Sequence, residues 1–103
     1  MRWPWRKKRK GGGGPLGDLV VVMYTRAAGC HLCEETYGVL EDASRREGFR
    51  LDIVPVDDDP ELEKSYGYRV PVVTIDGAEA FNYRVEPAQL RRKLYALSAA
   101  RKQ

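Results

Sequence analysis

The sequence predicts an α/β domain built on a four-stranded mixed β-sheet with helices on both faces, in the element order β-α-β-α-β-β-α. Two observations lead to this class. Valine-rich apolar runs alternate along the chain with segments of helical period, which is typical of strands joined by helical crossovers. Asp76-Gly77 lies between two short runs and predicts a tight hairpin. The first two strands are therefore expected to be parallel and the last two antiparallel.

The first strand is expected at Leu19–Thr25, an apolar and largely β-branched run. A four-residue loop follows it, and a helix is expected from about His31 to Glu47, with Gly48 as its C-terminal stop. The inner face of this helix is marked by residues at helical spacing: Cys33, Tyr37, Leu40 and Ala43.

The second strand is expected within Phe49–Asp57, where Pro55 favours an edge position or a bulge. The run Asp57-Asp58-Asp59-Pro60 is typical of a helix start, because an aspartate can cap the helix and proline suits its first turn. A metal site is the alternative interpretation of the three aspartates. Capping is the simpler account of the run, and Gly67 is expected to end the helix.

The third strand is expected at Val70–Ile75, and the returning strand at about Glu79–Tyr83. A last helix should start near Glu86-Pro87. Its buried side is marked by Leu90, Leu94 and Leu97, and its outer face is expected to hold solvated basic residues: Arg91, Arg92 and Lys93.

Residues 1–15 differ in composition from the rest of the chain. They hold six of the 18 basic residues, two tryptophans and a run of four glycines, and we expect them to form a disordered basic tail. The folded domain then spans residues 16–103. The tail could contact nucleic acid or an anionic membrane, with tryptophans stacking on bases or lying among headgroups. Alternatively, it is a solvated leader or an extension from an upstream start codon.

Size and cysteine content set further limits. At 103 residues the chain is long enough for one domain, and no apolar run approaches the ~20 residues of a membrane span. No apolar segment follows the N-terminal charges, so a secretory signal is not supported. The chain has two cysteines, fewer than a secreted disulfide scaffold would show. We therefore expect a cytoplasmic protein, and a monomer.

Cys30 and Cys33 form a C-x-x-C motif between a strand and a helix start. Unpaired backbone N–H groups and the helix dipole stabilise an anion there, so the pKa of Cys30 should fall below the free value of about 8.5. Cys30 is the predicted nucleophile. Cys33, one turn along the helix, is the predicted resolving thiol. The alternatives are a metal or cluster ligand, or a cysteine pair whose activity has lapsed.

Two neighbouring side chains are candidates for substrate binding. His31 follows the nucleophile and, if protonated, would stabilise its thiolate; otherwise it is an exposed loop residue. Arg26 could favour the thiolate or bind a carboxylate of the substrate.

The C-x-x-C motif after the first strand, the segment Arg69-Val70-Pro71 and the element order together resemble the thioredoxin fold, and within it the glutaredoxin-like family. The resemblance covers residues 18 to about 98. It implies that Pro71 follows a cis peptide bond and packs against the active-site disulfide. It also implies that Val70 offers its backbone N–H and C=O to an extended thiol substrate.

The chain departs from typical glutaredoxins in three places. His31-Leu32 stands between the cysteines, where Pro-Tyr is usual, and Ala27 lies where glutathione-dependent members often carry a basic residue. No Gly-Gly turn follows the hairpin. The pattern D-G-x-x-x-F-x-x-R-V, which begins at Asp76, is similar to that of small uncharacterised glutaredoxin-like proteins.

We therefore predict a thiol–disulfide oxidoreductase that acts on disulfide-containing proteins or small thiols, with no bound metal or cofactor. Its electrons would come from glutathione or from a reductase. One alternative is a binding module in which two chains share a metal or an iron–sulfur cluster through Cys30. Another is a redox-sensing, non-catalytic adaptor that docks through its basic tail.

Overall fold

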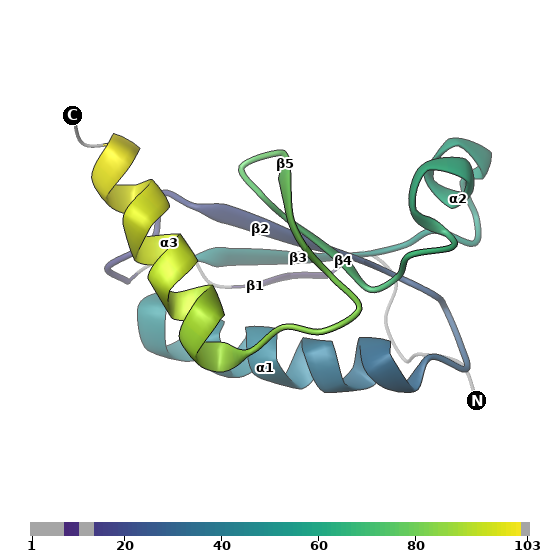
Figure 1. Ribbon diagram of the computed structural model, residues 1–103, viewed down its shortest axis with the longest axis horizontal. Helices are drawn as coiled ribbons and strands as arrows, with labels where there is room; N and C mark the ends of the chain where they lie inside the picture. The colour runs from purple at the N-terminus through teal and green to yellow at the C-terminus, as the bar shows by residue number, and fades with distance from the viewer. Residues whose placement is uncertain (1–7, 11–13, 102–103) are drawn as a thin grey trace.

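The computed structural model describes residues 8–10 and 14–101. Apart from a short first strand, its elements follow the predicted order β-α-β-α-β-β-α (Figure 1). In chain order they are β1 (Lys8–Lys10), β2 (Val20–Thr25), α1 (His31–Glu47), β3 (Arg50–Pro55), α2 (Pro60–Tyr66), β4 (Val72–Ile75), β5 (Ala78–Asn82) and α3 (Pro87–Arg101).

The strands form one mixed sheet in the order β1-β3-β2-β4-β5. β2 pairs with β3 in parallel, whereas β2 with β4 and β4 with β5 are antiparallel. The four predicted strands and their directions are therefore confirmed. Pro55 is the last residue of β3, and β1 pairs only with Leu51–Ile53 of that strand. Because Pro55 has no backbone N–H to donate, its place outside the β1 pairing is the one expected for a proline in a strand.

Strand β1 is the difference from expectation. Lys8–Lys10 pair antiparallel with Leu51–Ile53, although they belong to the segment predicted to be disordered. Without β1, β3 would be an edge strand with unpaired backbone groups, and an extended segment of almost any sequence can pair there. Residues 1–7 and 11–13 lie outside the described part of the chain, so the prediction for the rest of the tail stays a prediction.

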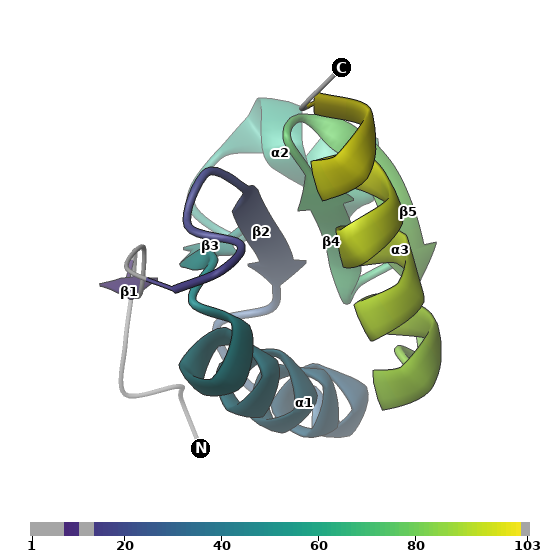
Figure 2. The ribbon, with the colours of Figure 1, turned by 90° about the vertical axis from the view of Figure 1, so that its left-hand side faces the viewer.

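Helices α1 and α3 lie together on one side of the sheet, and α2 lies on the other side at one end (Figures 1 and 2). Along β2, buried and half-buried residues alternate, as expected for a strand with one covered face. The core between the sheet and the two long helices includes Leu19, Val21, Met23, Leu40, Phe49, Leu51, Ile53, Ile75, Leu90 and Leu94.

Helix α1 ends at Gly48, as predicted, in the left-handed conformation with φ 82°. A second glycine packs against it, since a Cβ on Gly48 would lie 2.1 Å from the Cα of Gly14. The backbone N–H of Leu16 donates to the carbonyl of Glu47 at 2.8 Å. The segment leading into β2 therefore crosses the end of α1 at backbone contact.

The Asp76-Gly77 hairpin also forms as predicted. Both residues have positive φ values, 51° and 89°, which a type I′ turn requires. The Asp76 carboxylate additionally accepts the backbone N–H of Val20 at 3.0 Å. This turn therefore fixes the β4–β5 register and joins it to the start of β2.

One of the three consecutive aspartates, Asp59, caps α2, and a second, Asp57, binds the β2–α1 loop. Asp59 accepts the N–H groups of Glu61 and Leu62 at the start of α2, and Asp57 accepts that of Ala27 at 2.7 Å. Within residues 8–10 and 14–101, no group of three or more potential ligands is placed to hold a metal ion. The same residues contain no helix of the length and apolarity needed to cross a membrane.

Candidate active site

Cys30 is the N-cap of α1. Its extended backbone (φ −117°, ψ 97°) turns the chain from the β2–α1 loop into the helix, and its Sγ accepts the backbone N–H of Cys33 at 3.1 Å. Its carbonyl accepts the N–H of Glu34 at 3.2 Å. The sulfur thus takes the position of a capping side-chain oxygen, where an anion is stabilised by unpaired N–H groups and the helix dipole.

The two cysteines differ in exposure. Cys30 is half-buried, whereas Cys33, on the inner face of α1, is fully buried. They are joined by a disulfide, with their Cα atoms 5.2 Å apart. Cys30 is therefore the more accessible residue of the pair. This asymmetry is what a division into an attacking and a resolving thiol would require, and that division stays a prediction.

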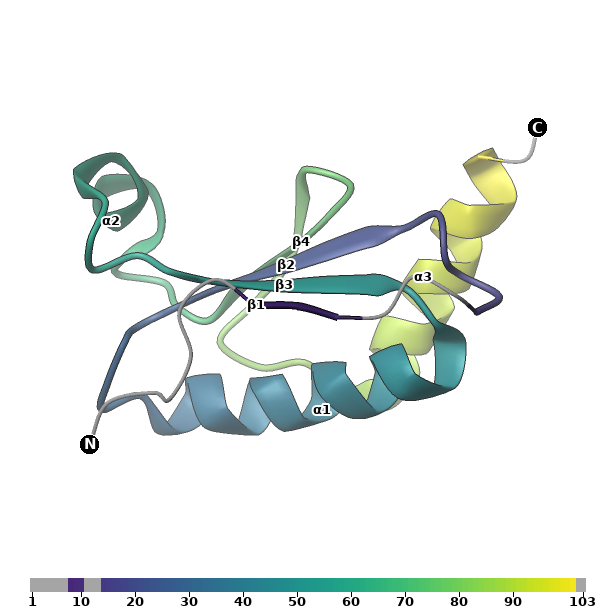
Figure 3. The same ribbon diagram turned by 180° about the vertical axis from the view of Figure 1, so that it is seen from behind.

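The Val70–Pro71 peptide bond is cis, as the family resemblance predicts. Pro71 immediately precedes β4, and Val72 at the start of β4 pairs with Tyr24 near the end of β2. Because the chain leaves β2 for Cys30 at the same edge, the register brings the Val70–Pro71 turn and the β2–α1 loop to one end of the sheet. Figures 1 and 3 show both at this end from opposite sides.

Arg26 lies in the β2–α1 loop, but its guanidinium is bound to α2. One terminal nitrogen donates to the Glu63 carboxylate at 2.7 Å, and the other donates to the carbonyl of Gly67 at 2.9 Å. Asp57 lies 3.8 Å away. Arg26 therefore fastens α2 to the loop that carries Cys30, and its nitrogens already have partners within the chain.

A second contact between α2 and the sheet is aromatic. The rings of Tyr24 and Tyr66 stack with their centroids 4.2 Å apart, and the Arg69 guanidinium lies 5.7 Å from the centre of the Tyr66 ring. Burial raises the pKa of Tyr24, and the neighbouring Tyr66 adds to the rise. Tyr24 is therefore a neutral packing residue here.

His31 begins α1 and is exposed. The structure thus brings four of the six predicted site residues to one edge: Cys30, Cys33, Val70 and Pro71. His31 directly follows Cys30 and is exposed to solvent. The guanidinium of Arg26 is paired with Glu63 of α2.

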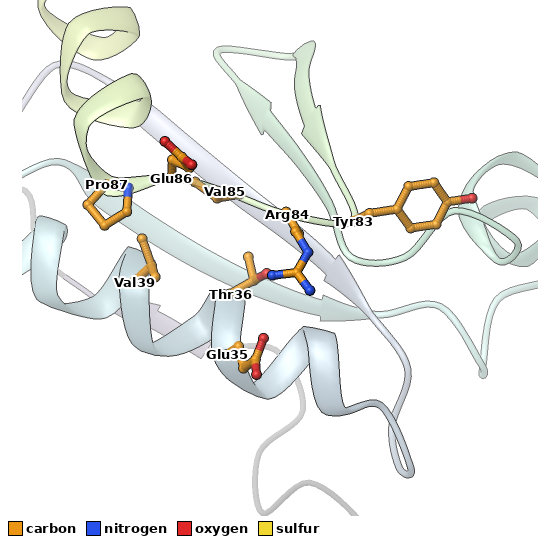
Figure 4. A pocket seen from close by; sticks show the side chains of 8 residues that line it. All are labelled: Glu35, Thr36, Val39, Tyr83, Arg84, Val85, Glu86 and Pro87. Atoms are coloured by element: carbon orange, nitrogen blue, oxygen red, sulfur yellow. The ribbon is translucent and has the colours of Figure 1, made fainter.

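A groove of about 170 Å³ adjoins α1 on its α3 side (Figure 4). Its lining residues come from α1, from the β5–α3 loop and from the first residue of α3: Glu35, Thr36, Val39, Tyr83, Arg84, Val85, Glu86 and Pro87. Arg84 extends from the loop toward Thr36 and Glu35 (Figure 4). No local sequence pattern indicates this groove, because only tertiary packing places the loop beside α1.

Comparison with known proteins agrees with this geometry. The sequence profile described as "Glutaredoxin-like domain (DUF836)" matches residues 20–95, from the start of β2 into α3. The chain belongs to this glutaredoxin-like family. The match includes both cysteines and the Val70–Pro71 turn, and excludes the basic tail.

Solved structures similar to this glutaredoxin-like domain come from two bacteria. The X-ray structure of target protein XcR50 from X. campestris shares 34% sequence identity with a TM-score of 0.60, covering 74% of this chain and 96% of that one. The solution structure of protein Ne2328 from Nitrosomonas europaea shares 28% identity with a TM-score of 0.63, covering 73% and 89%. No match is found among curated proteins. These likenesses support the thioredoxin-like fold and a redox module with a cysteine pair.

Proposed function

We propose that this glutaredoxin-like domain is a thiol–disulfide oxidoreductase. The observation that supports it most directly is the asymmetry of the cysteine pair: Cys30 is accessible and caps α1 with its sulfur, while Cys33 is fully buried one turn along. A reduced Cys30 at this position is a stabilised thiolate, and a thiolate is the species that attacks disulfides.

In the proposed reaction, the Cys30 thiolate attacks a substrate disulfide, forms a mixed disulfide and displaces one substrate thiolate. Cys33 then attacks Cys30 and displaces the second. The product is the Cys30–Cys33 disulfide, the state that the structure shows. Two electrons pass to the substrate, and glutathione or a reductase restores the dithiol in a reducing compartment such as the cytoplasm.

The test is the pH dependence of Cys30 alkylation in the Cys33→Ser variant. We expect an apparent pKa clearly below the free-thiol value of about 8.5, because the α1 N-terminus stabilises the thiolate. The matched control is the same variant unfolded in denaturant, where that stabilisation is lost. The wild-type protein should reduce a protein disulfide with glutathione or with thioredoxin reductase as electron source. An unshifted pKa together with no turnover would reject the oxidoreductase and favour a non-catalytic binding module.

A further inference from the structure

Two tyrosines with exposed rings flank the Val70–Pro71 turn. Tyr68, two residues before Val70, is 89% exposed, and Tyr83, directly after β5, is 47% exposed. The third exposed large hydrophobic residue of the described chain is Tyr95, whose hydroxyl is bound to a carboxylate of α1. Exposed aromatic surface is therefore concentrated beside the candidate active site.

Tyr83 is held in an unusual conformation. Its φ of 68° lies in the left-handed region, which bulky residues rarely adopt. Its backbone N–H donates to the carbonyl of Pro71 at 3.0 Å, and its hydroxyl donates to the carbonyl of Tyr68 at 3.2 Å. Figure 4 shows its ring directed away from the α1 groove. These contacts hold the Tyr83 ring against the turn. Bulky residues in the left-handed backbone region are strained, and such residues are frequent at functional sites.

The backbone between the two tyrosines is open. Among residues 8–10 and 14–101, none hydrogen-bonds to the N–H or C=O of Val70, whereas the Pro71 carbonyl is taken by Tyr83. Unpaired backbone groups at the margin of a sheet are a template for an added strand. A polypeptide provides such a strand together with side chains that can contact neighbouring rings.

Two guanidinium groups near this turn are already paired, whereas that of Arg84 extends toward α1 instead (Figure 4). Arg69 is paired with Glu79, and Arg26 is paired with Glu63. A small thiol that carries several carboxylates would have to displace these internal partners to use either guanidinium. An uncharged, apolar segment gains contact with the tyrosine rings without that exchange.

We propose that the dithiol acts on extended polypeptide segments with an apolar or aromatic residue next to the reactive cysteine, and that Tyr68 and Tyr83 select them. This inference rests on the proposed function and specifies its substrate class. The segment pairs with Val70, its cysteine faces Cys30, and its neighbouring side chain contacts Tyr68. The Cys30–substrate bond forms as the substrate S–S bond breaks. Cys33 then releases the second substrate thiolate, so that the two electrons come from the dithiol.

The test measures mixed-disulfide formation in the Cys33→Ser background with three reagents that share one leaving group, thionitrobenzoate. The first is a cysteine peptide with phenylalanine beside the cysteine, and the second is the same peptide with glycine in that place. The third is 2-mercaptoethanol. Each is activated as its thionitrobenzoate disulfide, and release of thionitrobenzoate gives the rate constant. Tyr68→Ala is compared with Tyr68→Phe, which keeps the ring.

We expect the unmodified background to favour the phenylalanine peptide over the glycine peptide, and Tyr68→Ala to lower that ratio about fivefold. Tyr68→Phe should restore it. Equal loss of rate with all three reagents, or an unchanged ratio, would overturn the inference; circular dichroism checks that the variants are folded. Turnover by the wild-type protein is measured separately. Its absence would reject the proposed function, while the trapping ratios would still decide whether Tyr68 selects polypeptides.

Discussion

The two ends of helix α1 differ in what their polar groups bind. At the N-terminal end, the Cys30 sulfur caps the helix and remains accessible, next to the exposed His31. At the C-terminal end, Glu47 is 6% exposed, and its carboxylate accepts hydrogen bonds from Arg91 and Tyr95 of α3. One helix thus has an anchored end that contributes stability and a more open end that carries the proposed reactive cysteine.

Packing around the anchored end extends to the sheet. The Ser44 hydroxyl donates to the carbonyl of Phe49 at 2.8 Å, and the Phe49 ring is fully buried. The proposed reactive cysteine and these stabilising contacts are therefore separated by the length of α1. Substitutions at one end should therefore leave the property of the other end unchanged.

The largest expected effect is on turnover. Cys30→Ser should reduce disulfide reduction to the uncatalysed rate, because the hydroxyl of serine is a poor nucleophile at neutral pH. Serine is also a good N-cap, so the unfolding free energy should stay within about 0.5 kcal/mol of that of the reduced wild type. Enzymatic assay and denaturant unfolding under reducing conditions measure the two quantities. Wild-type turnover in the variant would refute the role of Cys30, and a large loss of stability would break the separation.

The next effect tests the anchored end. Gly48→Ala should lower the unfolding free energy by about 1–3 kcal/mol, because alanine disfavours a positive φ and its Cβ would collide with Gly14. The control is Gly38→Ala within α1, where an added Cβ meets no atom within 4 Å; it should raise stability by about 0.5–1 kcal/mol. Denaturant unfolding compares the two, and similar values for both would contradict the backbone contact. Neither variant should alter the alkylation rate of Cys30.

The smallest effect is pH-dependent. Hydrogen bonding from Tyr95, together with Arg91, lowers the pKa of Glu47 below its usual 4.5. A carboxylate whose pKa is lower in the folded state stabilises the fold above the unfolded pKa and loses that contribution as pH falls through the folded value. Glu47→Gln should therefore reduce the free energy of unfolding by about 1 kcal/mol at neutral pH, and by progressively less as the pH falls below 4.5.

Denaturant unfolding of the wild type and of Glu47→Gln, from neutral pH to below 4.5, measures the difference in their free energies of unfolding. A difference that does not change with pH would exclude the charge of Glu47 as its source. Arg91→Ala serves as the matched control, because it removes one partner and leaves the carboxylate in place.

Much of the fold follows from local rules. Asp76-Gly77 specifies its hairpin, Gly48 ends α1 and Asp59 starts α2, because each depends on the conformational preferences of a few adjacent residues. The cysteine pair at the helix start was predictable for the same reason.

Other features depend on distant segments. Arg91 is exposed, as expected for the outer face of α3, but it also pairs with Glu47. Arg26 was a candidate for substrate binding, yet it pairs with Glu63. Strand β1 forms because the edge of β3 is free to pair, which the composition of Lys8–Lys10 does not indicate.

The sequence by itself therefore determined the order of elements, their caps and turns, and the two thiols at the start of α1. The tertiary structure decided which side chains surround those thiols. Pairing of β4 with β2 brings Val70 and Pro71 to their edge of the sheet, and the return of β5 places Tyr83 beside that turn. The physical reason is range: caps and turns are stabilised by neighbours along the chain, whereas a site is assembled by packing between residues far apart in it.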